Sequence, residues 1–146
     1  MPTRFLRYLV PDDRERFLES LLDSATDYAI VTLDDAGLIT GWNSGAEAIL
    51  GWTEAEVLGH LGEMIFTPED RAADVPRREM DTARETGKAS DERWHLRKDG
   101  SRFWANGSMM PLVGGDGYLK ILRDRTAQHR SQQCTETRAP AVQTNP

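Results

Sequence analysis

The stretch from residue 28 to residue 59 constrains the fold most, because its turn and helix-cap signals agree on one arrangement. A β-rich run at Tyr28–Leu33 is followed by an acidic turn at Asp34–Gly37 and a second β-rich run at Leu38–Trp42. These signals predict an antiparallel hairpin. A segment rich in helix caps follows at once, so the expected local order is a hairpin that leads directly into short helices.

Repeated capping signals predict several helices between the hairpin and residue 86. Two capping-box patterns, each followed by a glycine that can end a helix, predict two short helices in succession. The boxes are Ser44 with Glu47 and Thr53 with Glu56. Thr67, followed by a proline and two acids, predicts another helix start. A helix at 77–85 is expected after an interruption by Pro76.

The remaining elements are three strands and an N-terminal helix. Residues 89–124 hold three β-rich segments, separated by the turn sequences KDGS at 98–101 and GGDG at 114–117. Residues 11–25 carry an apolar stripe between charged residues, which predicts an amphipathic helix. The stripe comprises Phe17, Leu18, Leu21 and Leu22. The first strand pair must join the last three strands in one antiparallel sheet, which is an α+β arrangement.

Length and composition favour a single domain and exclude some functions. A chain of 146 residues suits one domain. We expect an N-terminal extension at 1–10, a domain at 11–126, and a short exit helix with a disordered tail at 127–146. The net charge of −6 argues against nucleic-acid binding and against docking on anionic membranes. No apolar run approaches the ~20 residues of a spanning helix. The single cysteine, Cys134, excludes an internal disulfide framework. A cytoplasmic protein is expected.

Four segments, in their order and spacing, carry a family resemblance. They are GLITGWNSGAEAILGWTEAEVLG, FTPEDR, RWHLRKDGSRFWANGSMMPL and ILRDRT. Across residues 14–126 the chain resembles a PAS domain, in particular the kind that precedes bacterial sensor histidine kinases. The resemblance implies a five-stranded antiparallel sheet, with short helices between its second and third strands covering one face. It also implies a sensory role in signalling, as in two-component systems. No kinase segment fits into the residues that follow Thr126.

The resemblance allows the family's cofactors to be tested against this sequence. Photosensory members of the family bond flavin through a cysteine, and the corresponding residues 59–68 contain none. The flavin-binding amides of those members correspond here to His95, Ala105 and Leu122. Haem-binding members use a histidine in the segment equivalent to 75–85, which has none. Covalent flavin and histidine-ligated haem are therefore disfavoured, and the cofactor is unknown.

The resemblance also implies where a ligand cavity has its walls. The residues at those positions are Met64, Ile65, Phe66, Met80, His95, Ala105 and Leu122. Packing of an ordinary core, with no ligand, is the alternative role for each of them. A lone histidine on a strand, such as His95, is also compatible with a neutral core residue that makes one hydrogen bond.

Strand alternation separates the cavity residues from two tryptophans. If His95 and Ala105 point into the cavity, then Trp94 and Trp104 point to the outer face of the sheet, close to each other across the KDGS hairpin. The apolar stripe of helix 11–25 needs a cover too, so we expect this helix to cover the outer face of its own sheet or of a second copy. A homodimer through this face is expected. The alternative is a helix packed on its own sheet without a dimer.

The expected function is that of a sensory module without catalytic activity. Neither metal-site spacing nor a nucleophile–base arrangement can be identified among the histidines and the cysteine. Asp124 and Thr126 match the Asp-x-Thr motif through which such domains pass a signal to the following helix. A histidine kinase or another signalling protein is the expected partner. Two alternatives remain: a protein–protein interaction module with a filled core, and a fragment of a sensor kinase that has lost its output.

Overall fold

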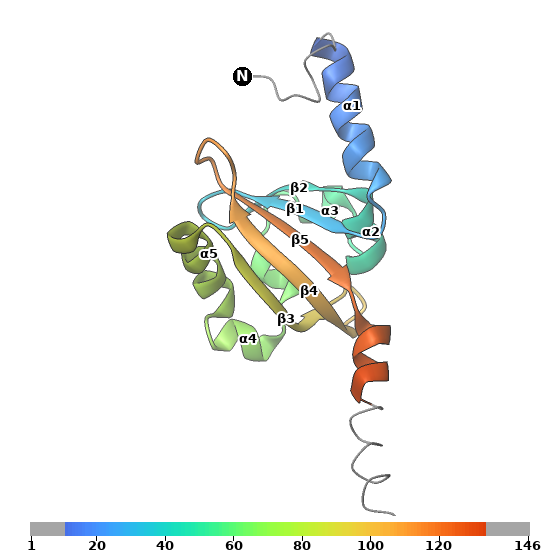
Figure 1. The fold of residues 1–146 in the computed structure, drawn as a ribbon, viewed down its shortest axis with the longest axis vertical. Helices are drawn as coiled ribbons and strands as arrows, with labels where there is room; N and C mark the ends of the chain where they lie inside the picture. The colour runs from blue at the N-terminus through green and yellow to red at the C-terminus, as the bar shows by residue number, and fades with distance from the viewer. Residues whose placement is uncertain (1–10, 134–146) are drawn as a thin grey trace, which may run out of the picture.

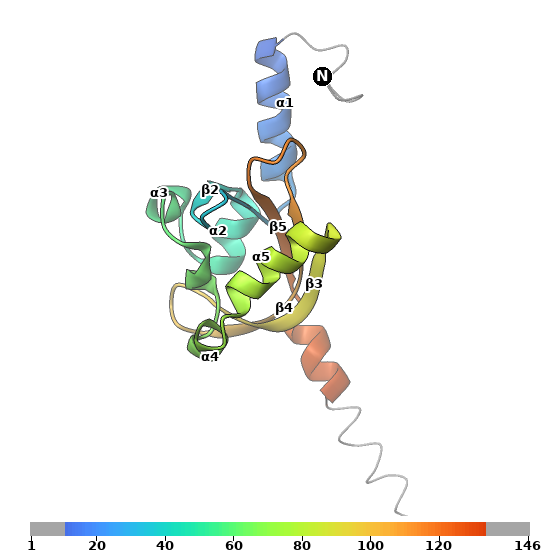
Figure 2. The ribbon, with the colours of Figure 1, turned by 90° about the vertical axis from the view of Figure 1, so that its left-hand side faces the viewer.

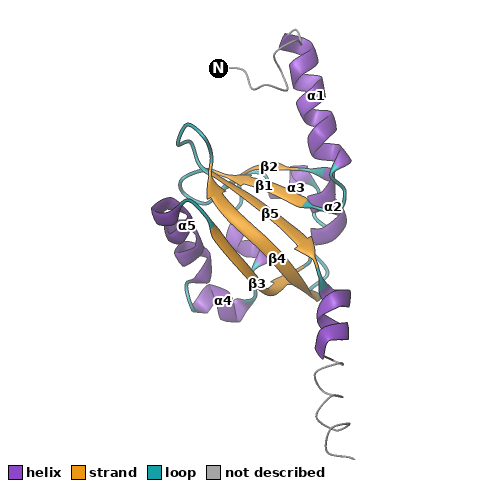
Figure 3. Ribbon diagram, viewed as in Figure 1, coloured by secondary structure: helices purple, strands orange, loops and turns teal. Residues whose placement is uncertain are grey.

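The fold is a five-stranded antiparallel sheet with helices on one side (Figures 1 and 3). The computed structural model describes residues 11–133, so the predicted extension at 1–10, the tail beyond residue 133 and Cys134 lie outside the described residues. The strand order is β2-β1-β5-β4-β3. The strands are β1 (Ala29–Leu33), β2 (Ile39–Trp42), β3 (Ala89–Leu96), β4 (Arg102–Pro111) and β5 (Tyr118–Asp124). The predicted pairing of the first hairpin with the last three strands is confirmed, because β1 pairs with β5.

Short helices between β2 and β3 cover one face of the sheet, which we call the inner face (Figure 2). They are α2 (Ser44–Leu50), α3 (Glu54–Val57), the 3-10 helix η2 (Gly62–Ile65), α4 (Pro68–Ala72) and α5 (Val75–Thr86). Helix α1 (Pro11–Ser24) precedes the sheet, and residues 126–133 form a helix after it. The predicted order of elements is confirmed. Helix η2 was not predicted, because its four residues carry no periodic pattern.

Strict alternation along the central strands separates the inner face from the outer face. On β4, Phe103, Ala105, Gly107 and Met109 are buried, whereas the residues between them are partly exposed or exposed. On β5 the buried residues are Tyr118, Lys120 and Leu122. The inner face therefore builds the hydrophobic core together with the helices, and one of its central positions is occupied by a lysine.

The side chain of Asn43 fastens α2 to the hairpin. Its Oδ1 accepts hydrogen bonds from the backbone N–H groups of Ala46 and Ile30, both at 2.9 Å. Its Nδ2 donates to the carbonyl oxygen atoms of Leu22 at 2.7 Å and Tyr28 at 3.2 Å. The prediction of Ser44 as the cap was therefore wrong by one residue, because only the longer amide side chain reaches both α2 and the strand.

Two further capping predictions are confirmed, whereas the predicted interruption at Pro76 is wrong. The capping box of Thr53 and Glu56 is present at the start of α3. Thr67 caps α4 as predicted, with Oγ1 accepting from the N–H of Asp70 at 3.2 Å. Pro76, however, lies in the first turn of α5 and does not interrupt it. Proline is tolerated there because the first N–H groups of a helix have no partner within the helix.

Helix α1 does not lie on the outer face of its own sheet, which corrects one of the two expected arrangements. It extends away from the body, and α1 and the helix at 126–133 project from opposite ends of the sheet (Figure 1). Only its last turn is held, where Ser44 Oγ donates to the carbonyl oxygen of Asp23 at 2.6 Å. Leu18, Leu21 and Leu22 remain exposed.

Candidate ligand cavity

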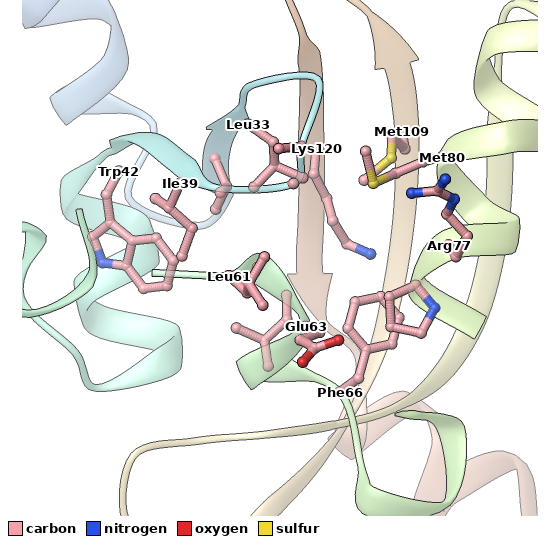
Figure 4. Close-up of a pocket in the computed structure, with 16 residues that line it drawn as sticks. Leu33, Ile39, Trp42, Leu61, Glu63, Phe66, Arg77, Met80, Met109 and Lys120 are labelled. Carbon is pink, nitrogen blue, oxygen red and sulfur yellow. The ribbon is translucent and has the colours of Figure 1, made fainter. Parts of the chain in front are cut away.

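A small cavity lies between the inner face of the sheet and the layer formed by η2 and α5 (Figure 4). Its volume is about 110 Å³. The lining residues come from the first hairpin, from the η2 segment, from α5 and from the middle of β4 and β5. They are Val31, Leu33, Ala36, Gly37, Ile39, Trp42, Leu61, Gly62, Glu63, Ile65, Phe66, Pro76, Arg77, Met80, Met109 and Lys120. The walls are mostly apolar, and the charged groups among them are Glu63, Arg77 and Lys120.

The close approach of η2 to the hairpin shapes one end of the cavity. Gly62 donates its backbone N–H to the carbonyl oxygen of Gly37 at 2.9 Å. A Cβ atom on Gly62 would lie 2.9 Å from Cδ2 of Leu33. A larger residue at position 62 would therefore push η2 away from the strand. The glycine keeps the wall close to the sheet and the cavity small.

Lys120 and Glu79 form a buried ion pair beside the cavity. The Nζ atom of Lys120, on β5, donates to Oε1 of Glu79, on α5, at 2.5 Å. The two side chains are 3% and 5% exposed. The ammonium group also lies 4.5 Å from the ring centroid of Phe66, where the face of the ring favours a cation. This pair links the central strand to the helix that forms one cavity wall.

The carboxyl group of Glu79 is incompletely satisfied. Its Oε2 atom is buried and has no hydrogen-bond partner within residues 11–133. Burial raises the pKa of Glu79, the ammonium group of Lys120 opposes that rise, and the nearby carboxylate of Asp91 adds to it. Asp91 itself is paired with Arg93 at 2.5 Å. A proton on Glu79 would turn its unsatisfied oxygen from an acceptor into a donor facing another carboxylate.

His95 is a neutral core residue next to the cavity. Its Nδ1 lies 3.0 Å from the carbonyl oxygen of Ile65, and a carbonyl can only accept, so the proton is on Nδ1. Its ring meets that of Phe66 edge to face, with centroids 4.6 Å apart. Burial lowers the pKa of His95 well below 6.5, and the charge of Lys120 lowers it further. This geometry matches the alternative of a core histidine with one hydrogen bond.

The seven residues predicted for the cavity divide into two groups. Ile65, Phe66 and Met80 line it. The other four, Met64, His95, Ala105 and Leu122, do not line this cavity and pack in or against the neighbouring core. The core on that side is filled by side chains such as Phe103 and Leu50.

Sequence reasoning missed the lysine in the cavity wall. Lys120 lies between the buried residues Tyr118 and Leu122 on β5. The residues directly before and after it, Leu119 and Ile121, are only partly buried. A period of two, anchored on Leu122 as an inward residue, places Lys120 inward as well. That signal was present in the sequence. Its partner Glu79 could not be found in this way, because helix α5 is far from β5 along the chain.

An aromatic cluster occupies the outer face at the end of the sheet opposite α1. Trp94 and Trp104 are cross-strand partners, with ring centroids 5.3 Å apart, so their predicted proximity on the outer face is confirmed. The ring of His129, from the helix at 126–133, stacks on Trp104 at 4.0 Å and meets Trp94 edge to face. The tryptophans are therefore partly covered by the chain's own exit helix, whereas His129 was expected to lie in a tail.

The junction between β5 and this helix is closed by Asp124 and Thr126. The Oδ1 atom of Asp124 accepts from the backbone N–H of Thr126 at 2.9 Å and from its hydroxyl group at 2.5 Å. The hydroxyl oxygen in turn accepts from the N–H of Trp104 at 2.9 Å. Burial alone would raise the pKa of Asp124, but the bonds from Thr126 and Arg97 hold it below its usual value.

Between residues 11 and 133, no group of three or more histidine, cysteine or acidic residues is placed to hold a metal ion. Within the same part of the chain, no helix is both long and apolar enough to cross a membrane.

The comparison with protein families agrees with this architecture. A model described as the PAS fold matches residues 13–125. The chain belongs to the PAS family. The family assignment covers the whole sheet, the helices on its inner face and nearly all of α1. PAS domains are sensory modules of signalling proteins and are not themselves catalytic, so residues 13–125 form such a module.

Relatives of this PAS domain occur in bacteria, archaea and fungi. "Two-component system protein A" of Emericella nidulans is 37% identical over 117 residues, which is 78% of this chain. The chain spans 17% of the length of that relative. The crystal structure of a PAS domain from Colwellia psychrerythraea is 30% identical, covers 80% of this chain and 99% of its own, and has a TM-score of 0.70. The PAS domain of an HTR-like protein from Haloarcula marismortui is 28% identical, with 77% and 93% coverage and a TM-score of 0.60.

Proposed function

We propose that this PAS domain senses a small molecule that binds in the cavity between the sheet and α5. The observation that carries the proposal is the cavity itself, whose walls come from both layers of the fold. Its volume of about 110 Å³ is below that of most sites for drug-sized ligands. A cavity of about 150 Å³ holds benzene, so the expected ligand has about four to six non-hydrogen atoms.

The position of the cavity suggests how occupancy reaches the end of the domain. Lys120 contributes to the wall and lies on β5, and the same strand ends at Asp124, which holds Thr126 and the start of the exit helix. A ligand that binds one arrangement of α5 and β5 better than another shifts the population between them. In this proposal, Asp124 and Thr126 transmit that shift to the helix at 126–133.

The proposed output partner is a histidine kinase or another protein of a two-component pathway. The name of the Emericella nidulans relative supports this assignment, and that relative is much longer than this chain. The domain would pass the signal to this partner and would not itself catalyse a reaction. A cytoplasmic location is part of the proposal, and the single cysteine in 146 residues supports it.

A cavity-directed experiment tests the sensory proposal. Val31 lines the cavity and is buried, so Val31→Phe should fill it and Val31→Ala should enlarge it. Small alcohols, amides and acids are titrated into each protein while amide chemical shifts are recorded by NMR. We expect shifts at residues of α5 and β5 in the parent and in Val31→Ala, and their loss in Val31→Phe. Shifts that persist unchanged in a folded Val31→Phe protein would contradict a ligand site in this cavity.

Self-association through α1 is the second part of the proposal. Leu18, Leu21 and Leu22 are 44%, 48% and 43% exposed on one side of a helix that stands away from the sheet. An apolar stripe of this kind usually marks an interaction site. A second copy of the chain is the proposed cover, in contact with the stripe that includes Phe17. Trp94 and Trp104 then contribute to the dimer contact only with the ring surface that His129 does not cover.

Analytical ultracentrifugation tests the homodimer. Leu21→Glu places a charge in the stripe and should shift the protein to the monomer, because burial of an unpaired charge is costly. Leu58→Glu is the matched control, since Leu58 is 42% exposed but follows α3, which lies over the inner face. We expect the control to sediment like the parent. Equal sedimentation of the parent and Leu21→Glu would exclude this interface.

A further inference from the structure

The chemistry of the cavity is set by a buried cation. Lys120 is the only lysine or arginine that is buried among the residues whose burial is described. A lysine in this position loses most of its hydration, and in the described part of the chain its charge is paired with that of Glu79. It is therefore the feature of the cavity that an ordinary apolar core would not contain.

The ammonium group has hydrogen-bonding capacity left over. Lysine carries three N–H donors, and within the described part of the chain its one acceptor is Oε1 of Glu79. The side chain enters the cavity from β5, between Leu33 and Met80 as drawn in Figure 4. An acceptor atom in the cavity could therefore bond to Lys120 without displacing any wall residue.

The other charged groups around the pair do not supply that acceptor. Arg77 and Glu63 line the cavity, but both are exposed, so solvent weakens their effect, and Arg77 also lies 3.9 Å from Asp81. His95 is neutral, as shown above. On β3, Asp91 is already paired with Arg93, which also bonds Asp70 at 3.2 Å.

We propose that the cavity takes a small aliphatic carboxylate whose charge is held by Lys120, and that Glu79 takes up one proton as the ligand binds. The inference rests on the cavity being a ligand site. The alkyl part of the ligand would lie against the apolar walls, such as Ile65 and Met80. With about four to six non-hydrogen atoms, propionate and butyrate fit the size limit.

Charge balance requires the proton. The pair is neutral when empty, so an added carboxylate would leave one uncompensated negative charge in a buried site, which is costly. One proton on Glu79 restores neutrality: the site then holds an ammonium group, a carboxylate and a carboxylic acid. Oε2 of Glu79 has no partner among the described residues and can carry that proton. Burial and Asp91 both favour the protonated form.

The test compares acids with their neutral isosteres. Propionate, butyrate, propionamide and butyramide are titrated into the full chain and followed by NMR, at about pH 6 and about pH 8, where both acids are ionised. We expect the acids to bind at least about tenfold more tightly than the amides at the lower pH. The dissociation constant of the acids should rise with pH by up to about tenfold per unit, because binding consumes a proton.

Variants of the pair separate its two roles. Glu79→Gln leaves Lys120 free to bind the anion, so it should bind the acids more tightly than the parent at about pH 8 and without dependence on pH. Lys120→Met combined with Glu79→Gln replaces the pair without leaving a buried charge, and should lose the preference for acids while keeping any binding of amides. Arg71→Gln is the control, because Arg71 is exposed on α4 and does not line the cavity, and we expect little change.

The possible outcomes distinguish a failure of the carboxylate inference from a failure of the sensory function on which it rests. If amides bind as well as acids, the carboxylate inference is wrong and the cavity remains a ligand site. If acids bind best but their affinity does not change with pH in the parent, the proton on Glu79 is excluded. If neither class binds the parent or Glu79→Gln, the inference and the sensory proposal both fail.

Discussion

His95 contributes to stability only in its neutral form. Its ring is buried, and its Nδ1–H group donates to Ile65. Because its pKa in the folded protein lies well below 6.5, the unfolded chain binds the proton first as the pH falls. The stability that His95 supplies is therefore complete above about pH 6.5 and is lost as the pH falls toward its folded-state pKa.

We expect the free energy of unfolding to fall below about pH 6.5 by up to about 1.4 kcal/mol per unit because of this residue. His95→Gln keeps a donor for Ile65 but cannot titrate, so it should be less stable at neutral pH and have a shallower slope. The contribution of Glu79 to stability depends on pH in the opposite direction. Its pKa is raised in the folded protein, so this contribution is lost as the pH rises. Chemical denaturation of the parent and His95→Gln between about pH 5 and 7 measures the difference. Parallel curves would contradict a neutral His95.

Asn43 is the residue on which the hairpin, α1 and α2 converge. Asn43→Ala removes the cap and leaves buried backbone groups without partners, so we expect a loss of about 2–4 kcal/mol. Asn43→Asp keeps the acceptor for Ala46 but cannot donate to Leu22, and should be intermediate. Ser44→Ala, at the residue first expected to be the cap, should cost about 1 kcal/mol or less. Urea denaturation ranks the three, and equal costs for Asn43→Ala and Ser44→Ala would contradict this account.

At the scale of elements, α2 packs against the segment before β1 without room for a side chain. A Cβ atom on Gly45 would lie 1.9 Å from the carbonyl oxygen of Tyr28 and 2.7 Å from that of Ala25. Glycine to alanine inside a helix normally stabilises by about 1 kcal/mol. At this position the backbone clash should reverse the sign and cost several kcal/mol, which is about the effect of strong overpacking.

Thermal unfolding of Gly45→Ala checks this expectation. Gly59→Ala is the control, because a Cβ there meets nothing within 4 Å, although the φ of +82° strains any side chain. We expect a cost of about 1–2 kcal/mol for the control. If Gly45→Ala were as stable as the parent, α2 could not lie as close to Tyr28 as described.

The ring of His129 holds the exit helix against two tryptophans. His129 is partly buried against Trp94 and Trp104, whereas its neighbours in the helix at 126–133 are mostly exposed. An aromatic pair contributes about 0.5–1.5 kcal/mol. His129→Ala should therefore release this helix from the sheet while the melting temperature of the domain changes little.

Hydrogen exchange across residues 126–133 measures that release. We expect protection to fall by up to about tenfold in His129→Ala, since local opening and not global unfolding controls exchange at an end of the chain. His60→Ala alters an exposed loop histidine and is the matched control. Unchanged protection in His129→Ala would mean that contacts other than the ring of His129 hold the helix.

At the scale of the whole molecule, charge opposes the proposed homodimer. Each chain carries a net charge of −6, so two copies repel each other. The proposed contact is apolar. Salt therefore screens the repulsion between the two chains without weakening the contact. We expect the dissociation constant of the dimer to fall as the ionic strength rises from about 0.05 M to about 0.5 M. Sedimentation equilibrium measures it. Dissociation by salt would point to an interface of ion pairs instead.

The sequence by itself determined the local elements and their order. Caps such as Thr53 and Thr67, and the turns at 98–101 and 114–117, act within a few residues, so their signals survive without the rest of the fold. Strand alternation placed Trp94 and Trp104 on the face opposite His95 for the same reason. The family pattern supplied the pairing of the first hairpin with the last three strands.

Only the tertiary structure decided the contents of the cavity and the cover of the outer face. Glu79 meets Lys120 across 41 positions of the chain, and His129 meets Trp104 where the exit helix leaves the sheet. Neither contact has a local signal, because each depends on how a helix packs on the sheet. The same is true of the cavity walls, since the space left beside Met80 depends on how closely η2 and α5 approach the strands.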